Sequence, residues 1–181
     1  MNSPGDTMTR VLMIRETLDN IPLFPNPPGF SVRWFEPGDE RLWVDIHQKA
    51  DTHNDITMEL FRQQFGSDDK LIAERQCYLI NSARKAIGTA TAWFNQNFDS
   101  GPIGRLHWVA IVPEYQGRGL AKPLMSVVCE RLRELGHQRA YLATALERKA
   151  AIRLYLRFGF TPFFRSEEEK LTWQRSGFAE F

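Results

Sequence analysis

The feature that most constrains this chain is an apolar strand that leads through a turn and two glycines into a long amphipathic helix. The segment reads Val109-Ala110-Ile111-Val112-Pro113-Glu114-Tyr115-Gln116-Gly117-Arg118-Gly119-Leu120-Ala121. The first amides of a helix lack partners within the helix, and the helix dipole makes that end positive. Glycine also lets a ligand approach the backbone closely. The segment therefore predicts a site for a phosphate or diphosphate where this helix begins.

Two common phosphate-binding patterns do not fit this segment. A Walker loop needs Gly-Lys-Ser/Thr, whereas Lys122 lies between Ala121 and Pro123. A dinucleotide fingerprint that starts at Gly117 would need Gly or Ala where Lys122 stands. The spacing that fits is Gln/Arg-x-x-Gly-x-Gly/Ala, filled by Gln116, Gly119 and Ala121.

The rest of the chain divides into an arm, residues 1–29, and a regular domain, residues 30–181. The arm holds five prolines and is expected to be extended, with residues 11–15 as either a short edge strand or a helical turn. In the domain, apolar spacing predicts an α+β fold, a mixed sheet with helices on its faces. The expected strands are 30–35, 77–81, 86–94, 105–112, 139–145, 160–164 and 171–174. The expected helices are 40–50, 57–65, 119–135 and 150–158, and Asp55 is a candidate cap for the second of them.

Composition excludes several classes of function. The chain is 43% hydrophobic and 25% charged, and its formal net charge is +1 without a basic block, so neither nucleic acid nor a membrane surface is an expected partner. Cys77 and Cys129 fit no disulfide framework or metal spacing, which favours a reducing cytoplasm. The apolar run 11–14 is too short for a signal peptide or a membrane span. His47 and His53 do not have metal-ligand spacing, so no metal site is expected.

The segment from Gln116 to Ala121 resembles the acetyl-coenzyme A loop of the GCN5-related N-acetyltransferases, the GNAT superfamily. The resemblance extends back to Val109 and forward to residues 151–160, which look like the family's closing helix and its following strand. The element order over residues 30–174 agrees as well. The resemblance implies a twisted, mostly antiparallel sheet that splays between two central strands, with helices on both faces.

The resemblance also implies how acetyl-CoA is held. Backbone groups of Val109 and Ile111 would pair with the pantetheine arm, and the Ile111 amide would donate to the thioester oxygen. Arg148 stands where the family often has Asn, and it could reach a phosphate or the pantetheine. The diphosphate would be wrapped by amides of Gln116, Gly117, Arg118, Gly119, Leu120 and Ala121.

Two residues are candidates for proton transfer. The resemblance places Tyr155 near the sulfur, and a phenol with a pKa of ~10 can donate a proton at neutral pH. The alternative is a core tyrosine on an apolar helix face. His107 lies on the strand that leads to the cofactor loop, and an imidazole with a pKa of ~6.5 suits a base that acts through water. The alternatives are a structural histidine, a water chain without a single base, or Glu114 and Glu147, which are more typical of solvated surface charges.

The acceptor pocket is expected between the helices in residues 40–65 and the strand around residue 93. Six aromatic residues there could stack on an acceptor or simply form core and rim: Trp43, Phe61, Phe65, Trp93, Phe94 and Phe98.

The sequence thus predicts an acetyl-CoA-dependent N-acetyltransferase, in which a primary amine of a small molecule or peptide attacks directly in a ternary complex. The alternatives are a non-catalytic acyl-CoA sensor of the same fold, and transfer to a hydroxyl or thiol. The sequence leaves open whether the acceptor is an antibiotic, a polyamine, an amino acid, a peptide N-terminus or a protein lysine. The resemblance is compatible with a homodimer.

Overall fold

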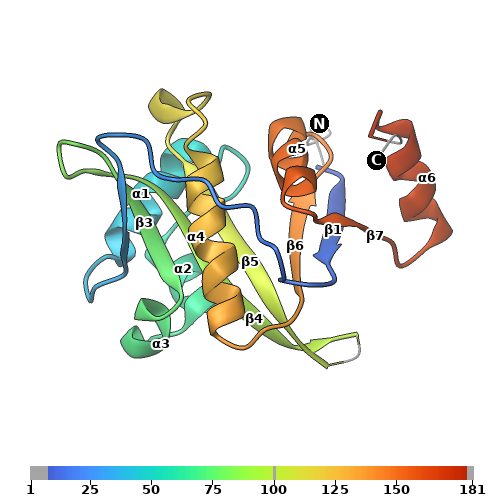
Figure 1. Cartoon of the computed structure of the whole chain (residues 1–181), viewed down its shortest axis with the longest axis horizontal. Helices are drawn as coiled ribbons and strands as arrows, with labels where there is room; N and C mark the ends of the chain where they lie inside the picture. The colour runs from blue at the N-terminus through green and yellow to red at the C-terminus, as the bar shows by residue number, and fades with distance from the viewer. Residues whose placement is uncertain (1–7, 100, 179–181) are drawn as a thin grey trace, which may run out of the picture.

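A seven-stranded sheet organises the computed structural model of the chain, which describes residues 8–99 and 101–178. The strand order is β2-β3-β4-β5-β6-β1-β7, and neighbours are antiparallel except for the parallel pair β5 and β6 (Figure 1). The expected α+β fold with a mixed, mostly antiparallel sheet is confirmed. The strands are β1 (Arg10–Arg15), β2 (Ser31–Trp34), β3 (Gln76–Ile80), β4 (Ala86–Phe98), β5 (Gly101–Ile111), β6 (Ala140–Ala145) and β7 (Thr161–Phe163).

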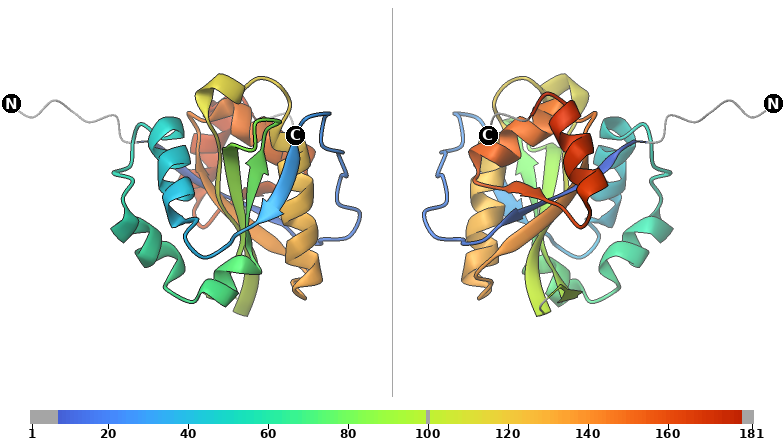
Figure 2. Two further views of the ribbon diagram at one scale, coloured as in Figure 1. Left: turned by 90° about the vertical axis from the view of Figure 1, so that its left-hand side faces the viewer. Right: turned by 90° about the vertical axis from the view of Figure 1, so that its right-hand side faces the viewer.

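Helices cover both faces of the sheet. Figure 2 shows α1 (Glu40–Ala50) and α2 (Met58–Phe65) on one face and α4 (Ala121–Glu134) on the other. A buried stripe of Leu124, Val128 and Leu132 seats α4 on the sheet, as the four-residue spacing predicts. No helix in the described part of the chain has the length and apolar character to cross a membrane. The remaining helices are α3 (Asp69–Ala73), the 3₁₀ turn η1 (Pro113–Tyr115), α5 (Lys149–Arg157) and α6 (Glu167–Arg175).

Three details differ from the sequence prediction. Residues 171–174, expected as a strand, lie in α6, because Ser166 Oγ accepts the Glu169 amide and three glutamates occupy the first turn. The short helix α3 was missed, although Asp68 caps it through the amides of residues 70 and 71. The cap of α2 is Thr57 rather than Asp55, since Thr57 Oγ1 accepts the Leu60 amide.

The segment before Phe30 contributes a strand to the sheet and then crosses α4. β1 pairs with β6 on one side and β7 on the other, so residues 11–15 form an inner strand instead of an edge strand or a helical turn. Ser126 of α4 fixes the extended part that follows, since its Oγ donates to Pro22 O at 2.8 Å and accepts the Phe24 amide at 2.9 Å. The expectation of an extended, proline-rich course therefore holds for residues 16–29.

The sheet opens between its two central strands. β5 and β6 pair with each other at Gly104↔Ala140 and Arg105↔Tyr141. Beyond this point they continue to Ile111 and Ala145 without pairing with each other, while β5 stays paired with β4 and β6 with β1. A Cβ at Gly104 would meet Arg139 O at 3.2 Å and Leu132 Cδ2 at 3.1 Å, so glycine permits the close approach where the strands meet. The expected splay is thus present.

Candidate active site

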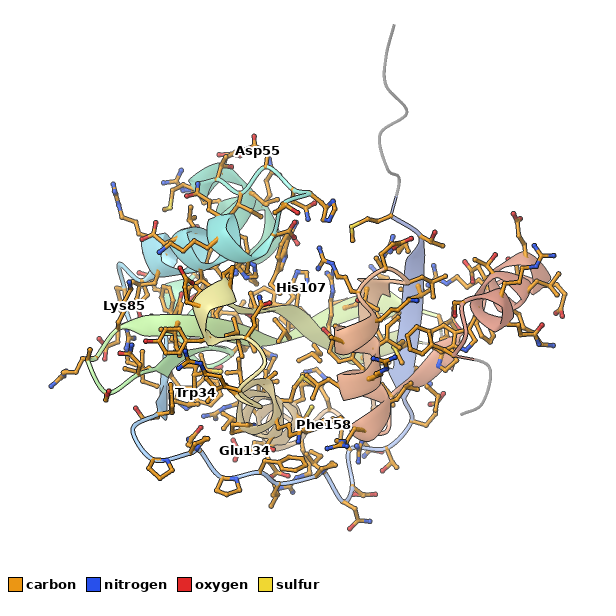
Figure 3. The ribbon with its side chains drawn as sticks, turned by 90° about the horizontal axis from the view of Figure 1, so that it is seen from above. Trp34, Asp55, Lys85, His107, Glu134 and Phe158 are labelled. Carbon is orange, nitrogen blue, oxygen red and sulfur yellow. The ribbon has the colours of Figure 1, made fainter. Side chains whose placement is uncertain are left out.

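A cavity of about 650 Å³ occupies the opening between β5 and β6. Figure 3 shows His107 between helices α1 and α2 on one side and β1 on the other. The cavity wall includes residues 105–111 of β5, residues 142–145 of β6, and side chains from α1, α2 and α5. Six residues singled out from the sequence line this one cavity: His107, Val109, Ile111, Gln116, Arg148 and Tyr155.

Side chains of the cofactor loop fold back onto the chain that precedes it. Gln116 Nε2 donates to Ile111 O at 2.8 Å, which ties the loop to the end of β5. Arg118 Nη2 donates to Glu114 O at 3.0 Å, and its guanidinium lies 4.8 Å from the centre of the Tyr115 ring. These contacts direct the polar side chains toward the strand and η1, so the backbone faces the space in front of α4.

The loop backbone fits a diphosphate. Gly117 and Gly119 have φ of 73° and 76°, a left-handed conformation that favours glycine. A Cβ built at either residue meets nothing within 4 Å, so the space beside the loop is open. No residue in the described part of the chain accepts a hydrogen bond from the amides of residues 117–121. Free amides at the positive end of a long helix are the groups that bind phosphate oxygens.

A bulge in β5 turns two consecutive side chains to the same side. Trp108 has φ of 51°, and the register with β4 shifts between Thr89 and Thr91. As a result, His107 Nε2 and Trp108 Nε1 lie 2.9 Å and 3.0 Å from Gln64 Oε1. Indole nitrogen only donates, so Gln64 Oε1 is an acceptor for both rings. His107 Nε2 therefore carries the proton, and His107 Nδ1 is left with a free lone pair.

Burial keeps His107 neutral. Desolvation, followed by the nearby charges of Arg105 and His47, lowers the pKa of His107 well below its ordinary value. Its side chain is 7% exposed and lines the cavity, so a neutral imidazole faces the opening. An uncharged imidazole offers the lone pair of Nδ1 and does not repel a cationic amine.

His47 is a cavity residue that the sequence prediction did not use. It is 2% exposed, lies 5.0 Å from the Trp108 ring centre, and its Nε2 has no hydrogen-bond partner among the described residues. Burial lowers the pKa of His47 to about 4. The i, i+4 spacing of His47 and Asp51 at the end of α1 was the available signal, because it places both on one helix face.

Tyr155 is both a buried helix residue and a cavity residue. It is 9% exposed, and burial raises the pKa of its phenol to about 12, so the hydroxyl stays protonated through the neutral range. It lines the same cavity as His107. At neutral pH the cavity therefore holds an uncharged imidazole at His107 and a phenol that keeps its proton at Tyr155.

Arg148 is engaged by a carboxylate. Its Nη2 donates to Asp51 Oδ2 at 3.1 Å, and both residues line the cavity. Burial would raise the pKa of Asp51, but hydrogen bonds from His53 and Asn54, with the charge of Arg148, hold it below its ordinary value. The carboxylate is therefore ionised and already fully used by the chain itself.

The weaker candidates for a base lie elsewhere. Glu147 accepts the Thr9 amide at 3.1 Å, and Glu114 borders a different hollow beside Lys85 and Tyr115. Neither is among the described residues that line the cavity.

The aromatic residues proposed for the acceptor pocket belong to the core and its rim. Trp43, Phe61 and Phe65 pack together at the centre of the α1–α2 layer, each 3% exposed or less. Phe98 stacks on Tyr141 with ring centres 4.3 Å apart, in a second cluster with Ile14 and Ile103. All six predicted aromatics are described, and none lines the cavity.

Known proteins resemble this chain in sequence. The sequence profile of the Acetyltransferase (GNAT) family matches residues 34–160. Mycothiol acetyltransferase of Thermomonospora curvata is 30% identical over 172 residues, which cover 88% of this chain and 54% of that protein. The mycothiol acetyltransferase of Sanguibacter keddieii is 28% identical over 155 residues, covering 80% and 48%. The chain thus spans about half the length of these relatives.

Solved structures resemble it in fold. A GCN5-related N-acetyltransferase from Sphaerobacter thermophilus superposes with a TM-score of 0.69 at 26% identity, covering 85% of this chain and 48% of that one. An aminoglycoside N-acetyltransferase in complex with CoA superposes with a TM-score of 0.59 at 21% identity, covering 80% and 95%, a likeness of fold alone. The family profile matches most of this chain, and the splayed sheet and the glycine loop are both present. This chain therefore belongs to the GNAT acetyltransferase family.

Proposed function

We propose that this chain transfers an acetyl group from acetyl-CoA to a primary amine of a small molecule, by direct attack in a ternary complex. The observation that carries the proposal is the shared cavity: a neutral imidazole, a protonated phenol and the edge of β5 line one opening that leads to the cofactor loop. The names of the relatives support acetyl as the group transferred and a small molecule as the acceptor.

The backbone would do most of the binding. Amides of residues 117–121 donate to the diphosphate, each contributing roughly 1.5–3 kcal/mol. Val112 N–H donates to Ile87 O on the β4 side at 2.9 Å, so the preceding amide, that of Ile111, faces the opposite edge and the slot. Along this edge Val109 and Ile111 pair with the pantetheine, and the Ile111 amide stabilises negative charge on the thioester oxygen.

Two side chains would move the protons. Acetyl-CoA supplies a thioester, a reactive acyl donor. An alkyl amine with a pKa of ~10.4 is almost wholly protonated at pH 7, so it must lose a proton before it attacks. His107 Nδ1 receives that proton, directly or through one water. Tyr155 donates its hydroxyl proton to the departing sulfur as the new N–C bond forms and the C–S bond breaks.

The experiment combines binding with turnover. Calorimetry with CoA and acetyl-CoA should give saturable heat, and thiol release should be detected with at least one amine in a panel that also contains hydroxyl and thiol acceptors. Saturable binding with no turnover on any acceptor would support the acyl-CoA sensor instead. Folded protein that gives no heat with CoA would overturn both readings.

A further inference from the structure

The cavity carries excess positive charge. Arg10 of β1, Arg105 of β5 and Arg148 line it. The sole acidic residue among the described residues of its wall is Asp51, and that carboxylate is paired with Arg148. Arg10 and Arg105 therefore have no opposing charge within the described wall of the cavity.

Arg105 stands out among the half-buried arginines. Arg75, Arg105 and Arg131 each have an Nε that is buried and lacks a partner among the described residues. Arg75 nevertheless donates through Nη1 to Ala92 O, and Arg131 pairs with Glu134. Within the described chain Arg105 has neither a hydrogen bond nor an ion pair, only the Tyr141 ring at 5.7 Å. A desolvated cation without a counter-charge is costly unless a ligand provides one.

The position of Arg105 identifies which ligand could do so. Arg105 and His107 are two residues apart on β5, so they project from the same face with Cα atoms about 7 Å apart. Ile111 lies six residues beyond Arg105, on the order of 20 Å along an ideal strand. An acetyl group held at Ile111 does not span that length, whereas an acceptor that lies against His107 reaches Arg105.

On the basis of the proposed function, we propose that the acceptor is an amine that also carries an anionic group, which Arg105 binds with help from Arg10 while the amine faces His107. A carboxylate fits the planar fork of the guanidinium, and a phosphate ester offers the same chemistry. Polycationic acceptors, in contrast, are repelled by the guanidinium groups of Arg10 and Arg105, which have no ion pair among the described residues.

Matched pairs of amines test this proposal. Each acid is compared with its uncharged counterpart: phenylalanine with phenethylamine, lysine with cadaverine, and an amino-sugar phosphate with the free amino sugar. At least one acid should exceed its counterpart tenfold or more in kcat/KM, and the carboxylate and phosphate pairs show which anion is used. In Arg105→Gln, KM for that acid should rise about ten- to hundredfold with kcat within a few-fold, while KM for the counterpart should not rise.

Arg175→Gln is the matched control. It removes the same charge from an exposed position on α6, outside the described wall of the cavity, and should leave both amines unaffected. Calorimetry adds a readout apart from turnover: with CoA present, the N-acetylated acid should bind the wild type and lose affinity in Arg105→Gln, while CoA affinity itself is unchanged.

Three results would overturn the inference. Equal kcat/KM within every pair would do so, as would an equal loss for both members in Arg105→Gln. A preference for succinyl-CoA over acetyl-CoA that depends on Arg105 would assign the anion to the acyl group instead. In the first two cases amines are still acetylated, so the proposed function stands. In the third case transfer to an amine stands and the acyl group is revised, whereas the absence of any acylation refutes the function itself.

Discussion

Asp51 Oδ2 lies 3.1 Å from Arg148 Nη2, and this ion pair joins the end of α1 to the residue that precedes α5. The pair links the two sides of the slot, because α1 packs on β4 and β5 while Arg148 follows β6. The Asp51 carboxylate already engages the Arg148 guanidinium, so a phosphate or pantetheine group that binds Arg148, as the family resemblance implies, would compete with Asp51.

Substitutions at this pair should change CoA affinity in opposite directions. Arg148→Asn removes a cation and should weaken CoA binding about three- to tenfold, the range of a partly exposed charged contact. Asp51→Asn removes the competing anion and should strengthen binding by a similar factor. Calorimetry measures both, with thermal unfolding as the check on folding. A change of the same sign in both variants would show that Arg148 does not bind the coenzyme.

Gln64 should act as a positioning residue for His107. Gln64→Glu keeps an acceptor for both rings but adds a negative charge beside His107, which favours the imidazolium and raises its pKa. The base must be neutral to work, so activity is lost as pH falls through that pKa, and the acid limb of the pH–rate profile should move to higher pH than in the wild type. A purely structural Gln64 would leave the position of that limb unchanged.

His107→Gln is the companion variant. It should lower kcat by roughly a hundredfold, at the lower end of the range for general base catalysis, with CoA affinity retained. Full activity in His107→Gln would assign deprotonation to a water chain.

Tyr155→Phe separates the catalytic from the packing role of this residue. The substitution keeps the buried ring and removes the hydroxyl, so folding stability should change by only about 1 kcal/mol. If the phenol donates the proton to the sulfur, kcat should fall by ~10²-fold or more while the Kd for CoA is unchanged. The steady-state rate of thiol release with both substrates saturating gives kcat directly. An unchanged kcat would show that Tyr155 has a packing role and does not donate the proton.

His47 should make folding stability depend on pH. Its pKa is about 4 in the folded chain and ~6.5 when unfolded, so below pH ~6.5 the unfolded state binds a proton that the folded state does not. Stability is therefore fully present above pH ~6.5 and falls as pH drops toward 4, by up to about 3 kcal/mol from this residue.

Urea unfolding at a series of pH values measures the slope of the free energy of unfolding against pH. His47→Gln should flatten it in part, because His107 titrates in the same direction and remains. His53→Gln, at an exposed position, is the matched control. An identical pH dependence in His47→Gln and the wild type would contradict the prediction.

The parts of the site that the sequence predicts are those that short local sequence patterns determine. The glycine loop, His107 and Tyr155 lie in or beside segments whose apolar spacing fixes their elements, and the splay followed from the family resemblance. His47 and Asp51 reach the cavity because α1 packs on β5, and Gln64 reaches it because α2 contacts β5 at His107. Spacing along the chain does not encode these tertiary contacts. The bulge at Trp108 is also not predictable from the sequence pattern, because regular strand alternation places consecutive side chains on opposite faces.

The errors at the chain's two ends have separate causes. Residues 171–174 (Leu-Thr-Trp-Gln) have strand-like composition, but the capping pattern Ser166-x-x-Glu169 before them starts a helix that includes them. For residues 11–15 the periodicity was too short to choose between strand and helix, and the deciding partners, β6 and β7, are distant in sequence.

The position of β1 has a consequence for how the chain acquires its fold. In the sheet Arg10 pairs with Ala145, and Ile14 pairs with Thr161. β1 can therefore pair only after most of the sequence has been synthesised, because both partner strands lie late in the chain. The hairpins β3–β4 and β4–β5 can close locally and early, whereas the pairing of β1 with β6 and β7 requires the closure of very long loops, which is entropically slow. Because Tyr155 and one wall of the cavity belong to the late half, catalytic competence should appear in refolding after the bulk of the secondary structure has formed.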